Sequence, residues 1–285
     1  MMRVCVLGHQ GMLGHVVASY LISQGCQVVT ISERFISSSP NLFLDEIKKV
    51  QPNWCVNCIL LPPRKAHSSQ ELFEINSFLP ELLATQLPPS IAIIQPSTDG
   101  VFSPLLSNRL VTDTPDANDD YGLSKCHGES VMKAHNHYII RCSIIGIELR
   151  TTYSLLSWFL AQKESVNGYV NHYWNGITTL QWAKVCSQII HKNTNTNYQL
   201  FQPGILPYLT KYELLIMFSQ IWEHHLDIKA ILAETPVVRT LVPNINTPSF
   251  TEQLRELRVW ETSYLQWNPG KRTDSISLSY IRPST

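Results

Sequence analysis

Apolar and polar positions follow two alternating patterns through the first half of the chain. Apolar residues at helical spacing predict a helix from Leu13 to a C-cap at Gly25, one over residues 70–86 with a kink at Pro80, and one from Tyr121 onward. Short apolar runs predict buried β-strands over residues 3–7, 27–31, 54–60, 90–95 and 138–145. Strands that alternate with helices are typical of an α/β fold with a doubly wound parallel sheet, which we predict here.

The second half of the chain has a weaker pattern. It predicts helices over residues 178–191 and 211–224 and a short strand over 175–177. Composition changes near Glu148, so we expect one domain over residues 1–148 and a smaller one over 149–285. We expect the polar tail after Trp267 to be poorly ordered.

Composition and charge narrow the choice of partners. The 285 residues are 44% hydrophobic, and 22 basic side chains balance 22 acidic ones. This neutral balance argues against nucleic acid or an anionic membrane as a partner. Charged residues make up only 15% of the chain, and both burial in a homodimer and an ordinary neutral enzyme surface explain that value. No apolar run reaches the ~18 residues of a membrane span and no secretory signal is visible, so we expect a cytoplasmic protein.

The seven cysteines suit buried thiols in a reducing compartment better than a disulfide framework. Cys55 and Cys58 have the C-x-x-C spacing of some metal and redox sites, but they fall inside a predicted strand. No second pair of Cys or His at ligand spacing completes a metal site. We therefore expect structural cysteines and no bound metal.

Three glycines, Gly8, Gly11 and Gly14, lie between the first predicted strand and the first predicted helix. In this setting the spacing indicates a dinucleotide-binding turn. The first glycine permits a tight turn, the second lets the backbone approach a pyrophosphate, and the third packs helix against strand. The helix N-terminus offers N–H groups to the phosphates, so we expect the turn, with Met12 and Leu13, to bind NAD or NADP.

The residues after the second strand distinguish the two cofactors. Glu33 would hold the ribose hydroxyls of NAD, whereas Ser32 and Arg34 would bind the 2′-phosphate of NADP. We favour NADP(H) and keep NAD(H) as the alternative.

Tyr121 and Lys125 stand at positions i and i+4, so they project from one face of the predicted helix. A neighbouring ammonium and a cationic nicotinamide both favour the phenolate and lower the pKa of the tyrosine. Tyr121 would then donate its proton to a carbonyl oxygen as hydride reaches the carbon. Ser97, Thr98 and Asp99 follow the strand over 90–95, at the carboxyl edge of the sheet where ligands bind. A hydroxyl there would hold the same carbonyl.

These pieces resemble the extended short-chain dehydrogenases/reductases, and within them the dTDP-4-dehydrorhamnose reductase-like group. The resemblance is convincing over residues 1–145, and it is fainter in the segment over 174–191, which typically returns to the cofactor domain. The matching segments are residues 8–14, 56–58, 75–76, 97–102, 121–129, 140–141 and 174–179.

The resemblance implies a catalytic triad of Thr98, Tyr121 and Lys125, with hydride from NAD(P)H. It also implies a nucleoside-diphospho-4-keto-6-deoxyhexose as substrate, UDP- or dTDP-linked, in deoxysugar and polysaccharide biosynthesis. Cys58 and Asn76, together with Tyr121 and Lys125, would also contact the cofactor. Residues expected to contact the substrate are Ser97, Asp99, Val101, Asn175 and Arg239, the last as a donor to the diphosphate.

The sequence departs from the group in the loop over 59–63 and in residues 154–159 and 171–174, which favours a different deoxysugar, such as a 2-acetamido one. Two other functions stay open. One is a bifunctional epimerase/reductase, for which no extra acid–base pair is visible. The other is a non-catalytic, cofactor-binding regulatory subunit, against which the intact triad argues.

Overall fold

A six-stranded sheet forms the centre of the protein, in a computed structural model that describes residues 1–104, 106–192 and 199–264. The strands lie in the order β10-β5-β4-β3-β1-β2, and each neighbouring pair is parallel. This arrangement confirms the predicted doubly wound sheet. The strands are β1 (Arg3–Leu7), β2 (Gln27–Thr30), β3 (Trp54–Asn57), β4 (Ala92–Ser97), β5 (Tyr138–Arg141) and β10 (Gln199–Phe201).

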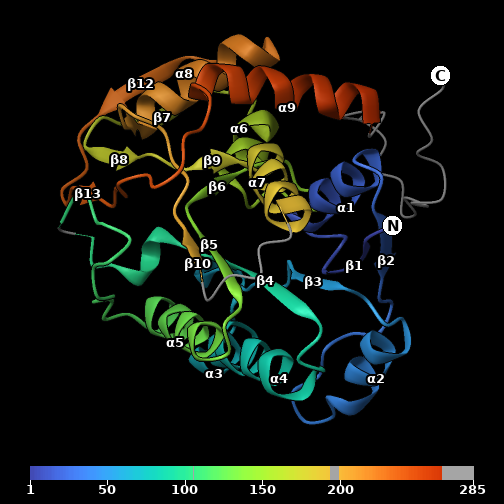
Figure 1. The fold of residues 1–285 in the computed structure, drawn as a ribbon. Helices are drawn as coiled ribbons and strands as arrows, with labels where there is room; N and C mark the ends of the chain where they lie inside the picture. Colours follow the sequence, from blue (N-terminus) through green and yellow to red (C-terminus); the bar gives the residue numbers. More distant parts are fainter. Residues whose placement is uncertain (105, 193–198, 265–285) are drawn as a thin grey trace.

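Helices cover both faces of this sheet (Figure 1). One face carries α1 (Gly14–Ser23) and α7 (Thr179–Lys192), which pack together. The other carries α2 (Asn41–Lys49), α3 (Ser69–Phe73), α4 (Leu79–Gln86) and α5 (Asp120–Ala134). Successive side chains of a strand point to opposite faces, so β1 contributes Val4 and Val6 to one core and Cys5 and Leu7 to the other. Burial on both faces explains why the strands read as continuous apolar runs.

Most first-half elements lie where the sequence predicts them, but three differ. The strand over 54–60 ends at Asn57, whose side-chain oxygen accepts a hydrogen bond from the Ile59 N–H at 3.1 Å and turns the chain. The strand over 90–95 extends two residues further, to Ser97. The strand over 138–145 divides into β5 and β6 (Ile144–Ile145), and β6 pairs with β9 (Ile177–Thr178) instead of continuing in the central sheet.

The segment predicted as one kinked helix over 70–86 consists of three consecutive helical pieces. A π-helical segment, Glu74–Phe78, separates α3 from α4, and Pro80 lies in the first turn of α4, where its missing N–H costs nothing. Gly128 of α5 packs directly on this segment, because a Cβ there would lie 2.5 Å from the Asn76 carbonyl oxygen. The π-helical segment therefore marks the place where α5 packs closely.

The second half of the chain lies mainly on one side of the sheet (Figure 1). In this half β9 pairs with β6, α7 packs on α1, and β10 joins the central sheet. The return of residues 174–191 to the cofactor domain stays a prediction. The domain boundary after residue 148 stays a prediction. The other elements are α6 (Leu155–Ala161), β7 (Val166–Tyr169), β8 (His172–Trp174), β11 (Leu209–Thr210), α8 (Lys211–Trp222), β12 (Ile228–Ile231), β13 (Val237–Val238) and α9 (Phe250–Tyr264).

Short strands in this half form two small sheets. One has the order β11-β8-β13, and the other pairs β12 with β7. The tail after Trp267 lies outside the described residues. Within the described ranges, no helix combines the length and apolarity needed to cross a membrane.

Candidate active site

A cleft of about 240 Å³ lies at the carboxyl ends of the central strands. Its lining residues come from the segments after β1, β3 and β5, from the end of β4 and from the start of α5. This is the edge of an open α/β sheet at which ligands bind. The lining residues are Gly11, Met12, Leu13, Cys58, Leu60, Pro62, Arg64, Lys65, Ser97, Thr98, Tyr121, Lys125, Cys142, Ser143, Ile144 and Glu148.

The glycine turn closes one end of this cleft. Gly8 has a positive φ of 70°, and its carbonyl accepts a hydrogen bond from the Gly11 N–H at 2.9 Å. A Cβ on Gly14 would collide with that same carbonyl. The N-cap of α1, Leu13, supplies no side-chain hydrogen bond to the first helical N–H groups. This tight backbone cradle at an uncapped helix start suits the pyrophosphate of a dinucleotide.

The structure brings Thr98, Tyr121 and Lys125 to the same cleft. Thr98 directly follows β4, and Tyr121 lies in the first turn of α5. Asp119 caps this helix by accepting a hydrogen bond from the Gly122 N–H at 2.7 Å. A Cβ on Gly122 would meet the Gly100 carbonyl oxygen at 2.5 Å. Glycine at position 122 therefore allows the tyrosine-bearing turn to pack against the strand end.

Burial dominates the ionisation of this pair. It raises the pKa of Tyr121 to about 12, although a side-chain hydrogen bond between Tyr121 and Thr98 opposes the shift. It lowers the pKa of the buried Lys125 to about 8, with Glu129 opposing. The Lys125 ammonium donates its hydrogen bond to the Pro96 carbonyl at 2.8 Å. The sequence predicts a lowered tyrosine pKa, whereas in the structure burial raises it. Tyr121 is therefore a protonated acid near neutral pH.

Asp99 is placed to orient the Thr98 hydroxyl. Thr98 donates to the Asp99 carboxylate at 2.9 Å and accepts from the Gly100 N–H at 3.0 Å. Burial raises the pKa of Asp99, and Thr98, Arg239 and Lys211 oppose that shift. Arg239, a candidate from the sequence, thus approaches the site, and its guanidinium also pairs with Asp119 at 3.6 Å. Lys211 stands in no sequence motif, and only the folded second half brings its charge near Asp99.

Two further predicted residues line the cleft. The Ser97 hydroxyl is buried and has no hydrogen-bond partner among the described residues, so it is ready to meet a ligand. Cys58 is a buried free thiol whose pKa burial raises, which makes it a poor nucleophile or metal ligand.

Other predicted site residues lie elsewhere. Asn76 holds the loop after β3 by bonding both backbone groups of Leu61, at 3.1 and 2.9 Å. Val101 is fully buried in a small core, and Asn175 clamps both backbone groups of Leu241, at 3.0 and 2.6 Å. None of these three lines the cleft. Their side chains contact other parts of the protein, and the sequence motifs do not distinguish such contacts from contacts with a ligand.

Ser32 and Arg34 are exposed and lie just beyond the end of β2. β2 pairs with β1, the strand that the glycine turn follows. They do not line the cleft. An exposed position there leaves both side chains free to meet the adenosine end of a cofactor.

A buried ion pair anchors the tyrosine-bearing helix two turns after Tyr121. Glu129 accepts two hydrogen bonds from Arg141 of β5, at 2.8 and 2.6 Å, and Arg141 also bonds Gln202 at 3.1 Å. Sequence motifs include both Glu129 and Arg141, but their pairing appears only in the structure. The pair fixes α5, and with it Tyr121 and Lys125, against the central sheet.

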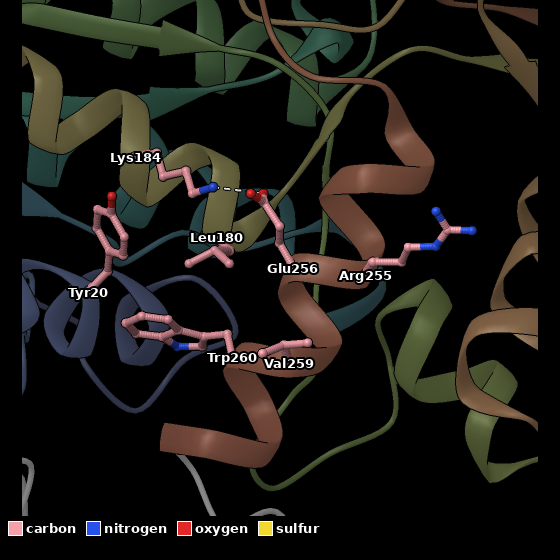
Figure 2. A pocket seen from close by; sticks show the side chains of 7 residues that line it. All are labelled: Tyr20, Leu180, Lys184, Arg255, Glu256, Val259 and Trp260. Atoms are coloured by element: carbon pink, nitrogen blue, oxygen red, sulfur yellow. Dashed lines mark hydrogen bonds and ion pairs between the residues drawn. The ribbon is translucent and has the colours of Figure 1, made fainter. Parts of the chain in front are cut away.

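A second hollow of about 380 Å³ lies between α1, α7 and α9. Figure 2 shows its lining, with the side chains of Leu180, Val259 and Trp260 between the helices and a Lys184–Glu256 ion pair at 2.7 Å on one side. It holds none of the predicted site residues. We therefore place the chemistry in the cleft at the sheet edge.

Comparisons with known proteins agree with this architecture. The family profile of the RmlD substrate binding domain matches residues 2–201. No curated protein sequence matches significantly.

Among solved structures, the chain is similar to a dTDP-4-dehydrorhamnose reductase from Clostridium acetobutylicum, with a TM-score of 0.77, 19% identity, and coverage of 92% of this chain and 100% of the other. It is also similar to a dTDP-4-dehydrorhamnose reductase from Bacillus anthracis in complex with NADP, with a TM-score of 0.79, 15% identity and coverage of 91% and 99%. A dTDP-glucose 4,6-dehydratase from Bacillus anthracis in complex with NAD has a TM-score of 0.71, 16% identity and coverage of 94% and 98%. Likeness at these identities shows the fold.

Proposed function

Because the chain belongs to the RmlD substrate binding domain family, we propose that it is a reductase that uses NADPH to reduce the 4-keto group of a nucleoside-diphospho-4-keto-6-deoxyhexose. The observation that carries this proposal is the convergence of Thr98, Tyr121 and Lys125 in one cleft with the glycine turn. The solved relatives that act on dTDP-linked sugars support a nucleotide sugar as the substrate class.

The residues present fit a dinucleotide. The cradle of Gly8, Gly11 and Gly14 and the start of α1 would hold the pyrophosphate, and Ser32 and Arg34 would hold the 2′-phosphate of NADP. NADPH, when bound, supplies the hydride. NAD(H) stays the alternative, since similar structures are in complex with either cofactor.

Tyr121 is the proposed proton donor. A tyrosine with a pKa of about 12 holds its proton at neutral pH and gives it up as negative charge develops on the carbonyl oxygen. Lys125, buried nearby, then stabilises the phenolate electrostatically. The Thr98 hydrogen already points to Asp99, so the unpartnered Ser97 hydroxyl is the readier donor to the carbonyl in this arrangement.

An open cleft favours an enzyme over a regulatory subunit. Thr98 and Tyr121 line a cavity of about 240 Å³ that the side chains of the described residues leave open. We propose a cytoplasmic role in deoxysugar and polysaccharide biosynthesis. We also propose that the sugar is linked to UDP or dTDP, that it carries a 2-acetamido substituent, and that the protein is a homodimer.

Incubation with NADPH and a panel of 4-keto-6-deoxy nucleotide sugars tests the chemistry, with product mass as the readout. Tyr121→Phe should lower turnover by about 10²–10⁴-fold, the usual contribution of a general acid, and leave cofactor affinity nearly unchanged. Tyr169→Phe, on β7 and away from the cleft lining, is the matched control. Near wild-type turnover of Tyr121→Phe on a true substrate would refute the assignment.

Cofactor choice is tested separately at Arg34. If its guanidinium pairs with the 2′-phosphate, Arg34→Ala should weaken NADPH binding by about 10- to 100-fold and NADH binding much less. Fluorescence titration with both cofactors measures this. Equal losses would mean that Arg34 is only a surface charge.

A further inference from the structure

A buried histidine directly follows the glycine turn. His15 is the second residue of α1, it is only 4% exposed, and it does not line the cleft. Its ring Nδ1 lies 2.7 Å from the Gly11 carbonyl oxygen, which also accepts the His15 backbone N–H at 3.3 Å. Burying an imidazole costs free energy that an aliphatic side chain at the same position would not cost. A polar ring held against a ligand-binding turn therefore points to a role beyond packing.

The contact with Gly11 determines which ring nitrogen of His15 carries the hydrogen. Burial lowers the pKa of His15 to about 4, and the bond to Gly11 opposes that shift, so the ring is neutral near pH 7. A neutral imidazole has one N–H and one bare nitrogen, and a carbonyl oxygen can only accept. The hydrogen therefore lies on Nδ1, and His15 donates it to the Gly11 carbonyl.

Two donors of His15 hold the Gly11 carbonyl on the helix side of the turn. The peptide that joins Gly11 to Met12 is trans, so its C=O and its N–H point in opposite directions. The Met12 N–H therefore points away from His15. Met12 lines the cleft, and no residue that the structure describes accepts a hydrogen bond from its backbone N–H. This donor is left available to a phosphate oxygen.

Gly11 is the part of the turn that gains most from being held. It has no Cβ, so its backbone loses more conformational freedom on ordering than that of any other residue type. The N-cap of α1, Leu13, supplies no side-chain hydrogen bond to the helix start. A Gly11 carbonyl that is fixed before the ligand arrives reduces the ordering cost that binding would otherwise carry.

We propose that His15 is a positioning residue that holds the peptide between Gly11 and Met12 in the orientation that the pyrophosphate of the dinucleotide requires. This inference rests on the proposed function, because it concerns the cofactor of that reaction. His15 acts through the Gly11 carbonyl, from behind the turn, and touches no reacting group. Its contribution therefore belongs to cofactor affinity and not to the chemical step.

Titration with dinucleotides and with a fragment tests this role. NADPH and NADH share the pyrophosphate, so His15→Leu should weaken both by the same factor, about 3- to 10-fold. His15→Asn should restore most of the affinity, because its amide nitrogen occupies the δ position of the side chain, as Nδ1 does. Adenosine 2′-phosphate lacks the pyrophosphate and should bind the wild type and both variants alike.

Ser19→Ala is the matched control on the same helix. Ser19 is 1% exposed, and its hydroxyl bonds the His15 and Val16 carbonyls at 2.8 and 3.1 Å, so the variant loses a buried hydrogen bond of α1 without touching the turn. Its dinucleotide affinity should equal that of the wild type. With saturating NADPH, His15→Leu should keep the wild-type kcat, while its KM for NADPH rises. His15→Phe keeps a ring and removes the donor, so it carries the test if His15→Leu folds poorly.

The ligand-free protein offers a second readout. Nitrogen-15 NMR of labelled histidine should show the His15 ring with its hydrogen on Nδ1 from pH 5.5 to 8. A ring with its hydrogen on Nε2 could not donate to the Gly11 carbonyl, and would overturn the proposed role.

The outcomes separate this inference from the proposed function. Unchanged NADPH and NADH affinities in His15→Leu would overturn the positioning role and leave the reductase proposal standing. Affinities that fall in His15→Leu and return in His15→Asn, in a protein that reduces no nucleotide sugar, would support the role and overturn the reductase. An equal loss of adenosine 2′-phosphate binding, or an equal loss in Ser19→Ala, would overturn the role, because it would reflect general damage to α1.

Discussion

The two halves of the molecule bury a glutamate in opposite ways. In the first half, Glu129 lies inside the tyrosine-bearing helix α5 and accepts two hydrogen bonds from Arg141. In the second half, Glu261 of α9 is only 1% exposed, and neither carboxylate oxygen has a hydrogen-bond partner among the described residues. Burial raises the pKa of Glu261 to about 8, and the nearby Trp222 and Arg258 oppose the shift only partly.

The paired Glu129 holds neighbouring elements in one geometry, whereas the unpaired Glu261 only fills space between helices. A paired charge in a buried site holds its neighbours in one geometry, because breaking the pair leaves an uncompensated charge. The Glu129–Arg141 pair therefore fixes α5, which carries Tyr121 and Lys125. An unpaired buried carboxyl avoids that cost by staying protonated, and it behaves as a neutral polar group in the α8–α9 interface. The stability of the α8–α9 interface then depends on pH, whereas α5 is held by the Glu129–Arg141 ion pair and not by a protonated carboxyl.

Breaking the buried pair should have the largest effect on stability. Glu129→Gln leaves the Arg141 guanidinium buried without a carboxylate, with the neutral Gln202 and the Phe102 ring beside it, so we expect a loss of about 3–5 kcal/mol in the free energy of unfolding. Denaturant titration measures this loss. A loss under about 1 kcal/mol would mean that the pair is not a positional anchor.

Removing the unpaired acid should change the pH dependence of stability. The unfolded chain releases the Glu261 proton near its ordinary pKa of 4.5, whereas the folded protein keeps it to about pH 8. Between these values the folded state binds more protons, so stability falls as pH rises, by at most about 1.4 kcal/mol per pH unit. Glu261→Gln should remove this fall and leave the variant relatively more stable at pH 9. Parallel unfolding curves for both proteins from pH 5 to 9 would contradict the prediction.

The smallest effect is expected at the surface. Lys184 of α7 and Glu256 of α9 form an ion pair at 2.7 Å whose side chains are 27% and 44% exposed. Water and salt screen such a pair, so Glu256→Gln should cost about 0.2–1 kcal/mol. Thermal unfolding at two salt concentrations measures it. A cost as large as that of Glu129→Gln would show that exposure does not distinguish the two pairs.

Sequence reasoning succeeded best where chemistry is local. Gly8 and Gly14 follow β1 and open α1, and Tyr121 and Lys125 lie one turn apart, so spacing alone indicates their neighbourhood. The ligand roles predicted for Asn76 and Asn175 stay predictions, because an asparagine that binds the chain's own backbone has the same sequence signal as one that binds a ligand. The short strands β7, β8, β11, β12 and β13 were missed, since two to four residues carry too little periodicity to predict an element.

The sequence by itself determined the doubly wound sheet, the glycine turn and the helix that carries Tyr121, because each depends on contacts between residues close in the chain or on strongly apolar strands. Tertiary structure alone decided which charges meet. Glu129 finds Arg141, Asp99 finds Lys211 and Arg239, and Lys125 turns to the Pro96 carbonyl. The physical reason is that the strength of a charge interaction depends on distance and burial in space, and neither is encoded in the spacing of residues along the chain.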